Sequence, residues 1–329
     1  MSGPIAMLAD EIELEIKAAF LDAIEDIRAN VDVPSLIGAI ERGDEEVLGA
    51  YVADRLRPVQ DIFARAFAQS GILAAERLGL TFDPMASTAV AARSSAVAGF
   101  MRSIVSDTAK AMAQAAFRTT MLSAAIAGTV LIGGVPAQAG DKAILVREII
   151  GLSPTQGANL TAFRAALENT MARQPQPSSR IGYRRELPVV AELPAHVLRY
   201  LNASQRSVIE AASGTLDQNQ VDALVAHQRR TLLKVRAGSI ATSGAVTATN
   251  AGEHASWRQA VENRDLGPEW RRYWHDVGDE KVRHAHREVS ALNPNGVGID
   301  EPFATPLGPC LHPPLEINCR CRVELREAA

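Results

Sequence analysis

The sequence predicts a mainly α-helical protein, with helical N-terminal and middle regions and a small, irregular α+β module at the C-terminus. Hydrophobic residues make up 47% of the 329 residues and charged residues 22%, so the chain can bury a core and is not disordered over most of its length. Aromatic residues are only 5% of the chain while alanine is abundant, which favours helices over a β-sandwich or barrel.

The sequence divides into three consecutive regions that differ in composition and charge. Residues 1–140 form a helical N-terminal region with an acidic arm, Ala-rich helices and a Gly-rich loop, and residues 141–256 form a helical, basic middle region. Residues 257–329 form the C-terminal module, which holds all three tryptophans, all three cysteines and four of the seven histidines. Its many prolines and irregular segments leave little apolar surface to bury, so other interactions must hold it together.

The N-terminal region begins with an amphipathic helix over residues 5–30, whose apolar side chains recur every three or four positions. A second helix is expected over 35–42 and a third over about 44–80. A turn at 81–84 then leads into a Pro-led, Ala-rich helix that extends to about residue 128. The expected buried side chains of the 44–80 helix are Val47, Tyr51, Leu56, Ile62, Phe63, Phe67 and Leu73.

Residues 119–140 carry no charge, a pattern that a membrane-spanning helix and a buried helix end can share. Glycines at 128, 133 and 134 and several polar side chains dilute the hydrophobicity of this stretch. We therefore predict a buried helix end followed by a Gly-rich loop, and no membrane partner.

The middle region contains a helix–turn–helix over residues 144–167. Gly151 stands where a C-cap is needed, Ser153 can cap the next helix, and Pro154 suits its first position. A polar, Pro-rich linker is expected over 173–180. A second helical pair is predicted near 194–213 and 217–236, with Asp217 as the N-cap of the latter.

Charge is distributed unevenly along a chain whose net charge is only −4, which excludes a globally cationic nucleic-acid binder. Residues 1–60 hold 13 acidic and 5 basic residues, so we expect the acidic arm to contact protein. Residues 141–260 hold 9 acidic and 14 basic residues, which suits either a solvated helix face or contact with DNA phosphates without sequence preference. The candidate phosphate contacts are Arg180, Arg184, Arg185, Arg229, Arg230, Lys234 and Arg236.

The C-terminal module carries the residues most suited to chemistry. Asp279, Arg283 and His286 have helical spacing, so we predict that they share one helix face and form a hydrogen-bonded array. Cys310, His312, Cys319 and Cys321 are the candidate ligands of a structural zinc, with His286 as a fifth. The alternative is a metal-free core, in which the cysteines pack as small apolar residues and His286 and Asp279 tie loops together.

No enzyme class has support from a motif. The chain lacks a P-loop, a dinucleotide-binding glycine pattern, a zinc-protease HExxH and a GxSxG elbow. A thiol enzyme with Cys319 as nucleophile, His286 as base and Asp279 as orienting group is the one arrangement available, and no spacing marks it as one. We predict a protein that is not an enzyme, has no cofactor apart from the candidate zinc, and is made in a reducing cytosol.

The ordered motifs of the chain resemble the Mu F-type minor head proteins of tailed phages, also called the phage head morphogenesis family. The resemblance covers roughly 144–329 and includes Gly151-Leu-Ser-Pro-Thr-Gln and Arg236-Ala-x-x-Ile240-Ala. Where family members often have Arg-Thr-Glu, this chain has Thr242-Ser-Gly. The C-terminal signature is represented by Trp274, Asp279, Arg283, His286, Phe303, His312-Pro313 and Asn318-Cys319-Arg320-Cys321.

The resemblance implies a structural minor capsid protein that acts in head morphogenesis and in packaging or ejection of DNA. It also implies the portal protein and the major capsid protein as partners, with packaged double-stranded DNA as a further contact. The expected location is the virion head near the portal, after assembly in the host cytoplasm. The alternative left open by the residues is a zinc-bearing cytosolic protein that binds nucleic acid.

Overall fold

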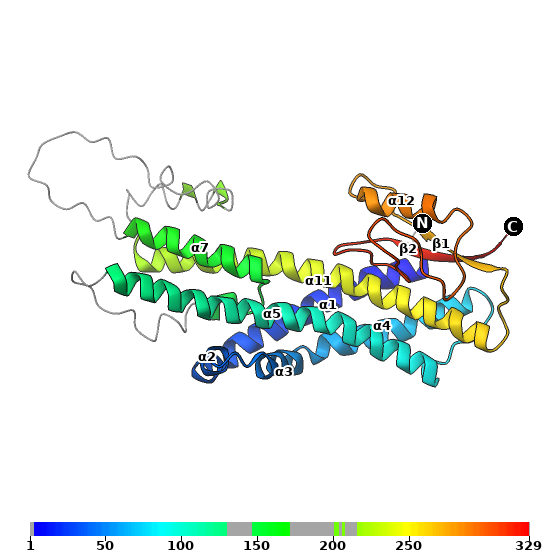
Figure 1. Ribbon diagram of the computed structural model, residues 1–329, viewed down its shortest axis with the longest axis horizontal. Helices are drawn as coiled ribbons and strands as arrows, with labels where there is room; N and C mark the ends of the chain where they lie inside the picture. The colour runs from blue at the N-terminus through cyan, green and yellow to red at the C-terminus, as the bar shows by residue number, and fades with distance from the viewer. Residues whose placement is uncertain (1–2, 130–146, 172–200, 204–205, 208–215, 329) are drawn as a thin grey trace, which may run out of the picture. The chain divides into compact units, whose positions relative to one another are not determined.

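The computed structural model describes residues 3–129, 147–171, 201–203, 206–207 and 216–328, and it is mainly helical with a small antiparallel sheet near the C-terminus (Figure 1). The predicted fold class is therefore confirmed. The helices are α1 (Pro4–Asn30), α2 (Val33–Glu41), α3 (Glu45–Arg55), α4 (Arg57–Glu76), α5 (Ser87–Thr129), α7 (Pro154–Met171), α11 (Gln218–Glu262) and α12 (His284–Leu292). The strands are β1 (Trp270–His275) and β2 (Arg322–Glu327).

The chain divides into two compact units that do not follow the three predicted consecutive regions. Unit 1 comprises Met1–Asp26, Tyr51–Ser106 and Val235–Ala329, and unit 2 comprises Ile27–Ala50 and Asp107–Lys234. The predicted boundary between residues 256 and 257 falls inside α11, which continues to Glu262. Long helices cause this difference, because α1, α5 and α11 each contribute residues to both units.

The predicted helix over 44–80 is wrong as a single element. It is two helices, α3 and α4, which separate at Leu56 (φ −85°, ψ 7°). Pro58 lies in the first turn of α4, where it needs no N–H partner, and its ring disfavours continuation of α3 into it. Val47 is correspondingly exposed rather than buried. The following helix also begins later than expected, at Ser87 rather than Pro84.

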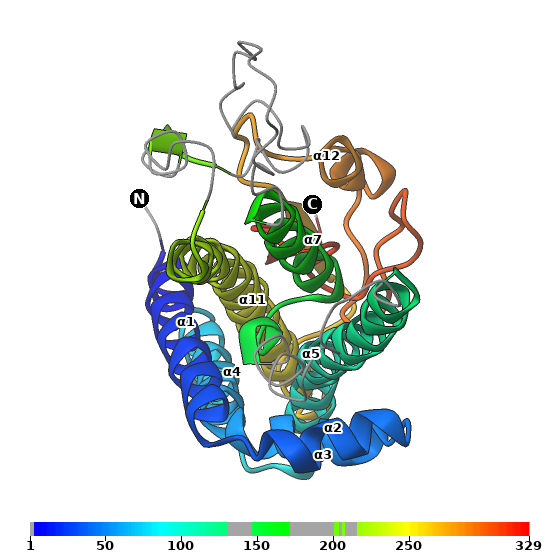
Figure 2. The ribbon, with the colours of Figure 1, turned by 90° about the vertical axis from the view of Figure 1, so that its left-hand side faces the viewer.

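Small residues let the helices of unit 1 approach closely. The apolar face of α1 is buried as predicted, with Ile16 and Phe20 fully covered. Residues from α4, α5 and α11 share one core cluster, and these helices can be followed in Figure 2. A Cβ added to Gly252 of α11 would lie 2.1 Å from the carbonyl oxygen of Phe67 in α4, so this crossing requires glycine.

The predicted helix–turn–helix of unit 2 is confirmed at its turn. Gly151 has φ +85°, and Ser153 and Gln156 form a reciprocal capping box at the start of α7. Asp217 caps α11 in the same manner with Gln220. Three other predictions concern residues outside the described part of the chain. They are most of the helix predicted near 194–213, the linker over 173–180, and residues 130–140 of the Gly-rich loop.

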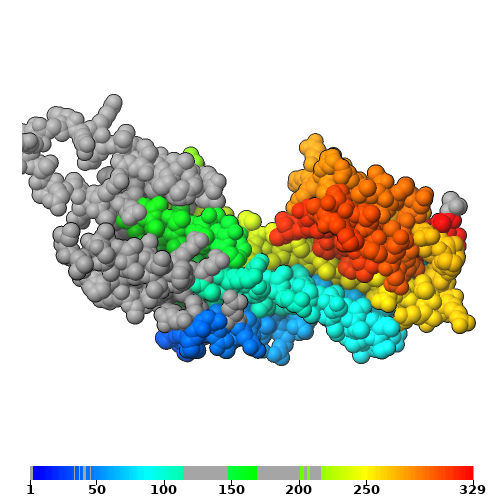
Figure 3. Space-filling view, viewed as in Figure 1, coloured from blue at the N-terminus to red at the C-terminus, as the bar shows by residue number. Residues whose placement is uncertain are grey.

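Within unit 1, the C-terminal module packs against the C-terminal end of α11 (Figure 3, orange and red against yellow). Strands β1 and β2 pair antiparallel with Trp274 opposite Val323, and Ser290 of α12 donates a 2.8 Å hydrogen bond to the carbonyl of Trp274. Trp274 and Phe303 make an edge-on aromatic contact in the module core, which also includes Trp257 of α11. Within the part of the chain that is described, no helix has the length and apolar character that membrane crossing requires.

Candidate functional site

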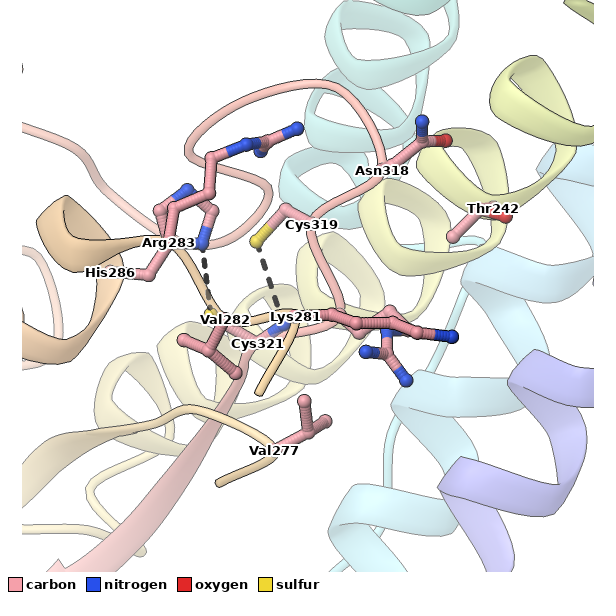
Figure 4. A pocket seen from close by; sticks show the side chains of 10 residues that line it. Thr242, Val277, Lys281, Val282, Arg283, His286, Asn318, Cys319 and Cys321 are labelled. Carbon is pink, nitrogen blue, oxygen red and sulfur yellow. Dashed lines mark hydrogen bonds between the residues drawn. The ribbon is translucent and has the colours of Figure 1, made fainter. Parts of the chain in front are cut away.

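Three potential metal ligands meet in the C-terminal module. His286 comes from the first turn of α12, and Cys319 and Cys321 come from the extended segment that leads into β2. Because side chains alternate along extended backbone, the C-x-C spacing puts both thiols on one side of this segment. The imidazole nitrogen and the two sulfurs all lie within 4.8 Å of one another, and all three residues are buried (Figure 4).

The two nitrogens of His286 have different partners. Nδ1 lies 3.4 Å from Sγ of Cys321, and Nε2 lies 3.2 Å from a carboxylate oxygen of Glu316. A carboxylate accepts hydrogen bonds, so Glu316 favours the tautomer in which Nε2 carries the proton. That tautomer leaves the Nδ1 lone pair facing the sulfurs.

The two thiols differ in the direction of their pKa shifts. A hydrogen bond from Cys321 lowers the pKa of Cys319 to about 6, against the raising effect of burial, and the backbone N–H of Cys321 adds a contact of 3.5 Å. The pKa of Cys321 is raised by its hydrogen bond to Cys319 and by burial, while the Trp274 indole opposes this shift. The two pKa values shift in opposite directions, so Cys319 ionises more readily than Cys321.

A pocket of about 360 Å³ opens beside these three residues (Figure 4). It is lined on one side by Thr242 of α11 and on the others by the loops before α12 and β2. Its charged lining residues are Lys281, Arg283 and Arg320. Solvent and small ligands can therefore reach the cluster from one side.

The predicted shared helix face of Asp279, Arg283 and His286 is wrong. The helix α12 begins at His284, so Asp279 lies in the preceding turn and Arg283 is the N-cap residue. Gly278, with φ +69°, directs the chain into this turn. An array does form, but through residues of other loops rather than along one helix.

The motif residues instead tie the loops of the module to one another. The half-exposed carboxylate of Asp279 pairs with Arg320, which lowers the pKa of Asp279. Arg283 donates a 2.8 Å hydrogen bond to the carbonyl of Ile317. Asn318 (φ +59°) fixes the loop to α11, since its backbone N–H donates to Ser243 Oγ at 3.1 Å.

Cys310 and His312 do not belong to the group of three. Cys310 forms an isolated β-bridge with Phe303, and its thiol donates to the carbonyl of His312. The ring of His312 lies 5.9 Å from that of His254 in α11. The predicted ligand set is thus divided, and His286 joins Cys319 and Cys321 because α12 packs beside β1.

Arg272 and Glu316 are residues that sequence reasoning missed. Arg272 is fully buried and donates hydrogen bonds to the carbonyls of Gly298 and Glu301, in one turn, and of Leu311, in a second irregular segment. A signal was present for Arg272. Trp270, Arg272 and Trp274 are every second residue of β1, so their side chains lie on the same side of the strand. Nothing in the local sequence around Glu316 indicates its contact with His286.

Two of the predicted phosphate contacts are buried, which corrects that part of the prediction. Arg229 is 1% exposed and donates to the carbonyls of Glu148 and Ile150, and Arg236 is 7% exposed and donates to the carbonyl of Ile104. Both satisfy backbone groups and are not available to DNA. Arg230 and Lys234 are exposed one turn apart on α11. Arg180, Arg184 and Arg185 lie outside the described residues.

The comparisons with known proteins bear on this same region. Residues 207–324 match the family model described as phage Mu protein F like protein. This part of the chain is similar to the Mu F family. The match confirms the predicted resemblance to the phage head morphogenesis family, over a shorter stretch than the predicted 144–329. No curated protein and no solved structure matches the chain.

The Mu F-like region contains nearly all of α11 and the C-terminal module to within β2. It therefore includes the cluster of His286, Cys319 and Cys321, the loop ties and the buried Arg272. Chemically, this arrangement can stabilise a thiolate or bind a soft metal ion through sulfur and nitrogen.

Proposed function

We propose that the chain is a structural minor head protein of a tailed phage, acting in head morphogenesis and in packaging or ejection of DNA. The single observation that carries the proposal is the Mu F-like match, which coincides with a compact module docked on α11. The proposed location is the virion head near the portal.

A structural rather than catalytic role suits the use of the motif residues. Asp279 pairs with Arg320, and the carboxylate nearest to His286 belongs to Glu316. The arrangement that the sequence offered for a thiol enzyme, with Asp279 orienting His286, is thus not formed. The same residues fasten loops that have little apolar surface of their own.

The exposed face of α1 favours protein partners, for which we propose the portal protein and the major capsid protein. Met7 and Leu14 are 64% and 70% exposed, and they lie on the same side as the exposed Asp10 and Glu11. A mixed apolar and acidic face suits a protein interface and is repelled by DNA phosphates.

Contact with packaged DNA is proposed through Arg230 and Lys234. Their one-turn spacing on an exposed part of α11 allows both cations to reach neighbouring phosphates. Such contacts carry no sequence information, as expected for a protein that meets the packaged genome.

Quantitative mass spectrometry of purified particles tests the proposal. The chain, the portal protein and the major capsid protein are counted in particles from the phage that encodes it. A fixed, low ratio to the portal protein is the expected result. Absence from both mature particles and assembly intermediates would contradict the proposal.

A further inference from the structure

We propose that His286, Cys319 and Cys321 bind a zinc ion, with the fourth position of the tetrahedron open to the adjacent pocket. This site differs from the ligand set that the sequence suggests, because Cys310 and His312 are not part of it. It stands on geometry alone and does not depend on the role proposed for the chain in the phage head.

The donor atoms are nearly in place for a tetrahedral ion. With zinc–sulfur bonds of about 2.3 Å and zinc–nitrogen bonds of about 2.0 Å, neighbouring ligand atoms lie about 3.5–3.8 Å apart. The observed Nδ1–Sγ distance to Cys321 is 3.4 Å, and no pair in the group exceeds 4.8 Å. Small side-chain rotations are therefore enough to bring the three atoms to one ion.

The surroundings of His286 resemble those of a metal-bound histidine. Ligating histidines commonly donate their second N–H to a carboxylate, which fixes the ring and its tautomer. Glu316 occupies this position at Nε2, and Arg283 lies 3.6 Å from the same carboxylate oxygen. Nδ1 is left to face the sulfurs, as ligation requires.

The indole of Trp274 provides a second, independent observation. Its Nε1–H is buried and has no hydrogen-bond partner in the described part of the chain. Trp274 lies in the same core cluster as Cys319 and Cys321. A buried N–H donor without a partner is available to a metal-bound thiolate, which retains negative charge.

Charge and access also suit a divalent, thiophilic ion. When zinc binds, the ligands are two thiolates and a neutral imidazole, and any thiol protons pass to solvent. Two thiolates neutralise the ion, so the nearby Lys281, Arg283 and Arg320 do not oppose it. The pocket reaches all three ligand residues, which lets water complete the coordination (Figure 4).

Metal analysis of the full-length protein tests the site directly. Protein purified in zinc-containing medium is expected to retain a single zinc ion per chain after gel filtration. Cys319→Ser and Cys321→Ser are expected to lose it, whereas the matched control Cys310→Ser retains it. For the imidazole, His286→Gln is compared with His284→Gln, which changes an exposed histidine of the same helix turn. Equal zinc loss in the control and site variants would overturn the assignment.

Spectroscopy of the wild-type protein keeps the test decisive if a variant fails to fold. Cobalt substituted for zinc should give tetrahedral d–d bands and a sulfur-to-metal charge-transfer band. X-ray absorption of the zinc form should show two sulfur neighbours and nitrogen or oxygen neighbours. A protein that remains metal-free in excess zinc, or that takes copper(I) but not zinc, would refute the proposal.

Discussion

The guanidinium carbon of Arg272 lies 5.0 Å from the ring centroid of Phe303, inside the core of the C-terminal module. The same guanidinium donates to the carbonyls of Gly298, Glu301 and Leu311, so it replaces the sheet hydrogen bonds that this irregular backbone lacks. A buried cation therefore organises the irregular segments of the C-terminal module. Its own pKa is lowered to about 10 by burial.

Replacing Arg272 is expected to disrupt the module. Arg272→Met keeps the stem but removes the buried guanidinium that joins three loop carbonyls, at a cost of about 3–5 kcal/mol in the free energy of unfolding. Urea denaturation and protease resistance of residues 257–329 measure this loss. Arg271→Met is the matched control, because the side chain of Arg271, the preceding residue, is partly exposed. This change should alter stability by less than about 1 kcal/mol. Equal effects of the two substitutions would contradict the role of Arg272.

The crossing of α4 and α11 gives a test based on two glycines of one helix. Gly252→Ala places a Cβ 2.1 Å from the carbonyl oxygen of Phe67, a backbone atom that cannot rotate away, so we expect a destabilisation of about 1–3 kcal/mol or more. Gly238→Ala meets nothing within 4 Å and should stabilise the helix by up to about 1 kcal/mol. Thermal unfolding of both variants distinguishes the two effects. Stabilisation by Gly252→Ala would disprove the close crossing.

Glu253 makes the stability of unit 1 depend on pH. Burial raises its pKa to about 8, against the opposing effect of Arg77 and Arg322. The unfolded carboxyl ionises near pH 4.5, so stability is lost as the pH rises from there to about 8, by at most about 1.4 kcal/mol per pH unit. Glu253→Gln imitates the protonated form and should flatten this loss between about pH 5 and 8. Glu262→Gln, an exposed change on the same helix, should leave the pH profile unchanged.

His254 makes the stability of unit 1 depend on pH below about pH 6.5. Burial lowers its pKa to about 3, and its Nε2 lies 2.8 Å from the carbonyl of Ile299. The unfolded imidazole takes up a proton below about pH 6.5, so stability is lost as the pH falls from there towards 3. Urea midpoints for Glu253→Gln between pH 6 and 4 should show this slope without the opposing carboxyl. A flat profile would show that His254 protonates without cost.

The exposed face of α1 should control incorporation into particles. Met7→Lys with Leu14→Lys removes the apolar part of this face without touching the core, and we expect the ratio of chain to portal protein to fall at least about tenfold. The control is Met85→Lys, which alters an equally exposed residue, at 70%, before α5. Mass spectrometry of particles measures both, and unchanged incorporation would place the protein interface elsewhere.

DNA contact through Arg230 and Lys234 is expected to be weak and sensitive to salt. Changing both residues to alanine should lower the slope of log affinity against log salt by roughly 2 for duplex DNA of any sequence. Lys110→Ala, an exposed lysine of α5 in unit 2, is the control. An unaltered slope would assign any DNA binding to other residues.

Local signals in the sequence determined the helical fold class, the buried face of α1, and the turn between Gly151 and Ser153. They also indicated the resemblance that the family match over residues 207–324 bears out. These features depend on residue spacing, caps and composition within short segments, which the sequence displays directly. The break at Leu56 shows where such local signals fail. The apolar spacing continues through residues 44–80 and predicts one helix, although Pro58 favours the start of a new one.

Only the tertiary structure decided which distant residues meet. It paired Asp279 with Arg320 rather than His286, placed Glu316 at His286, and separated Cys310 from Cys319 and Cys321. It also showed that Arg229 and Arg236 bind backbone carbonyls, although an arginine on a helix looks the same in sequence whether it faces solvent or a neighbouring element. The physical reason is common to all of these cases. Partners 30 or more residues apart are brought together by helix packing and strand register, and local spacing carries no record of either.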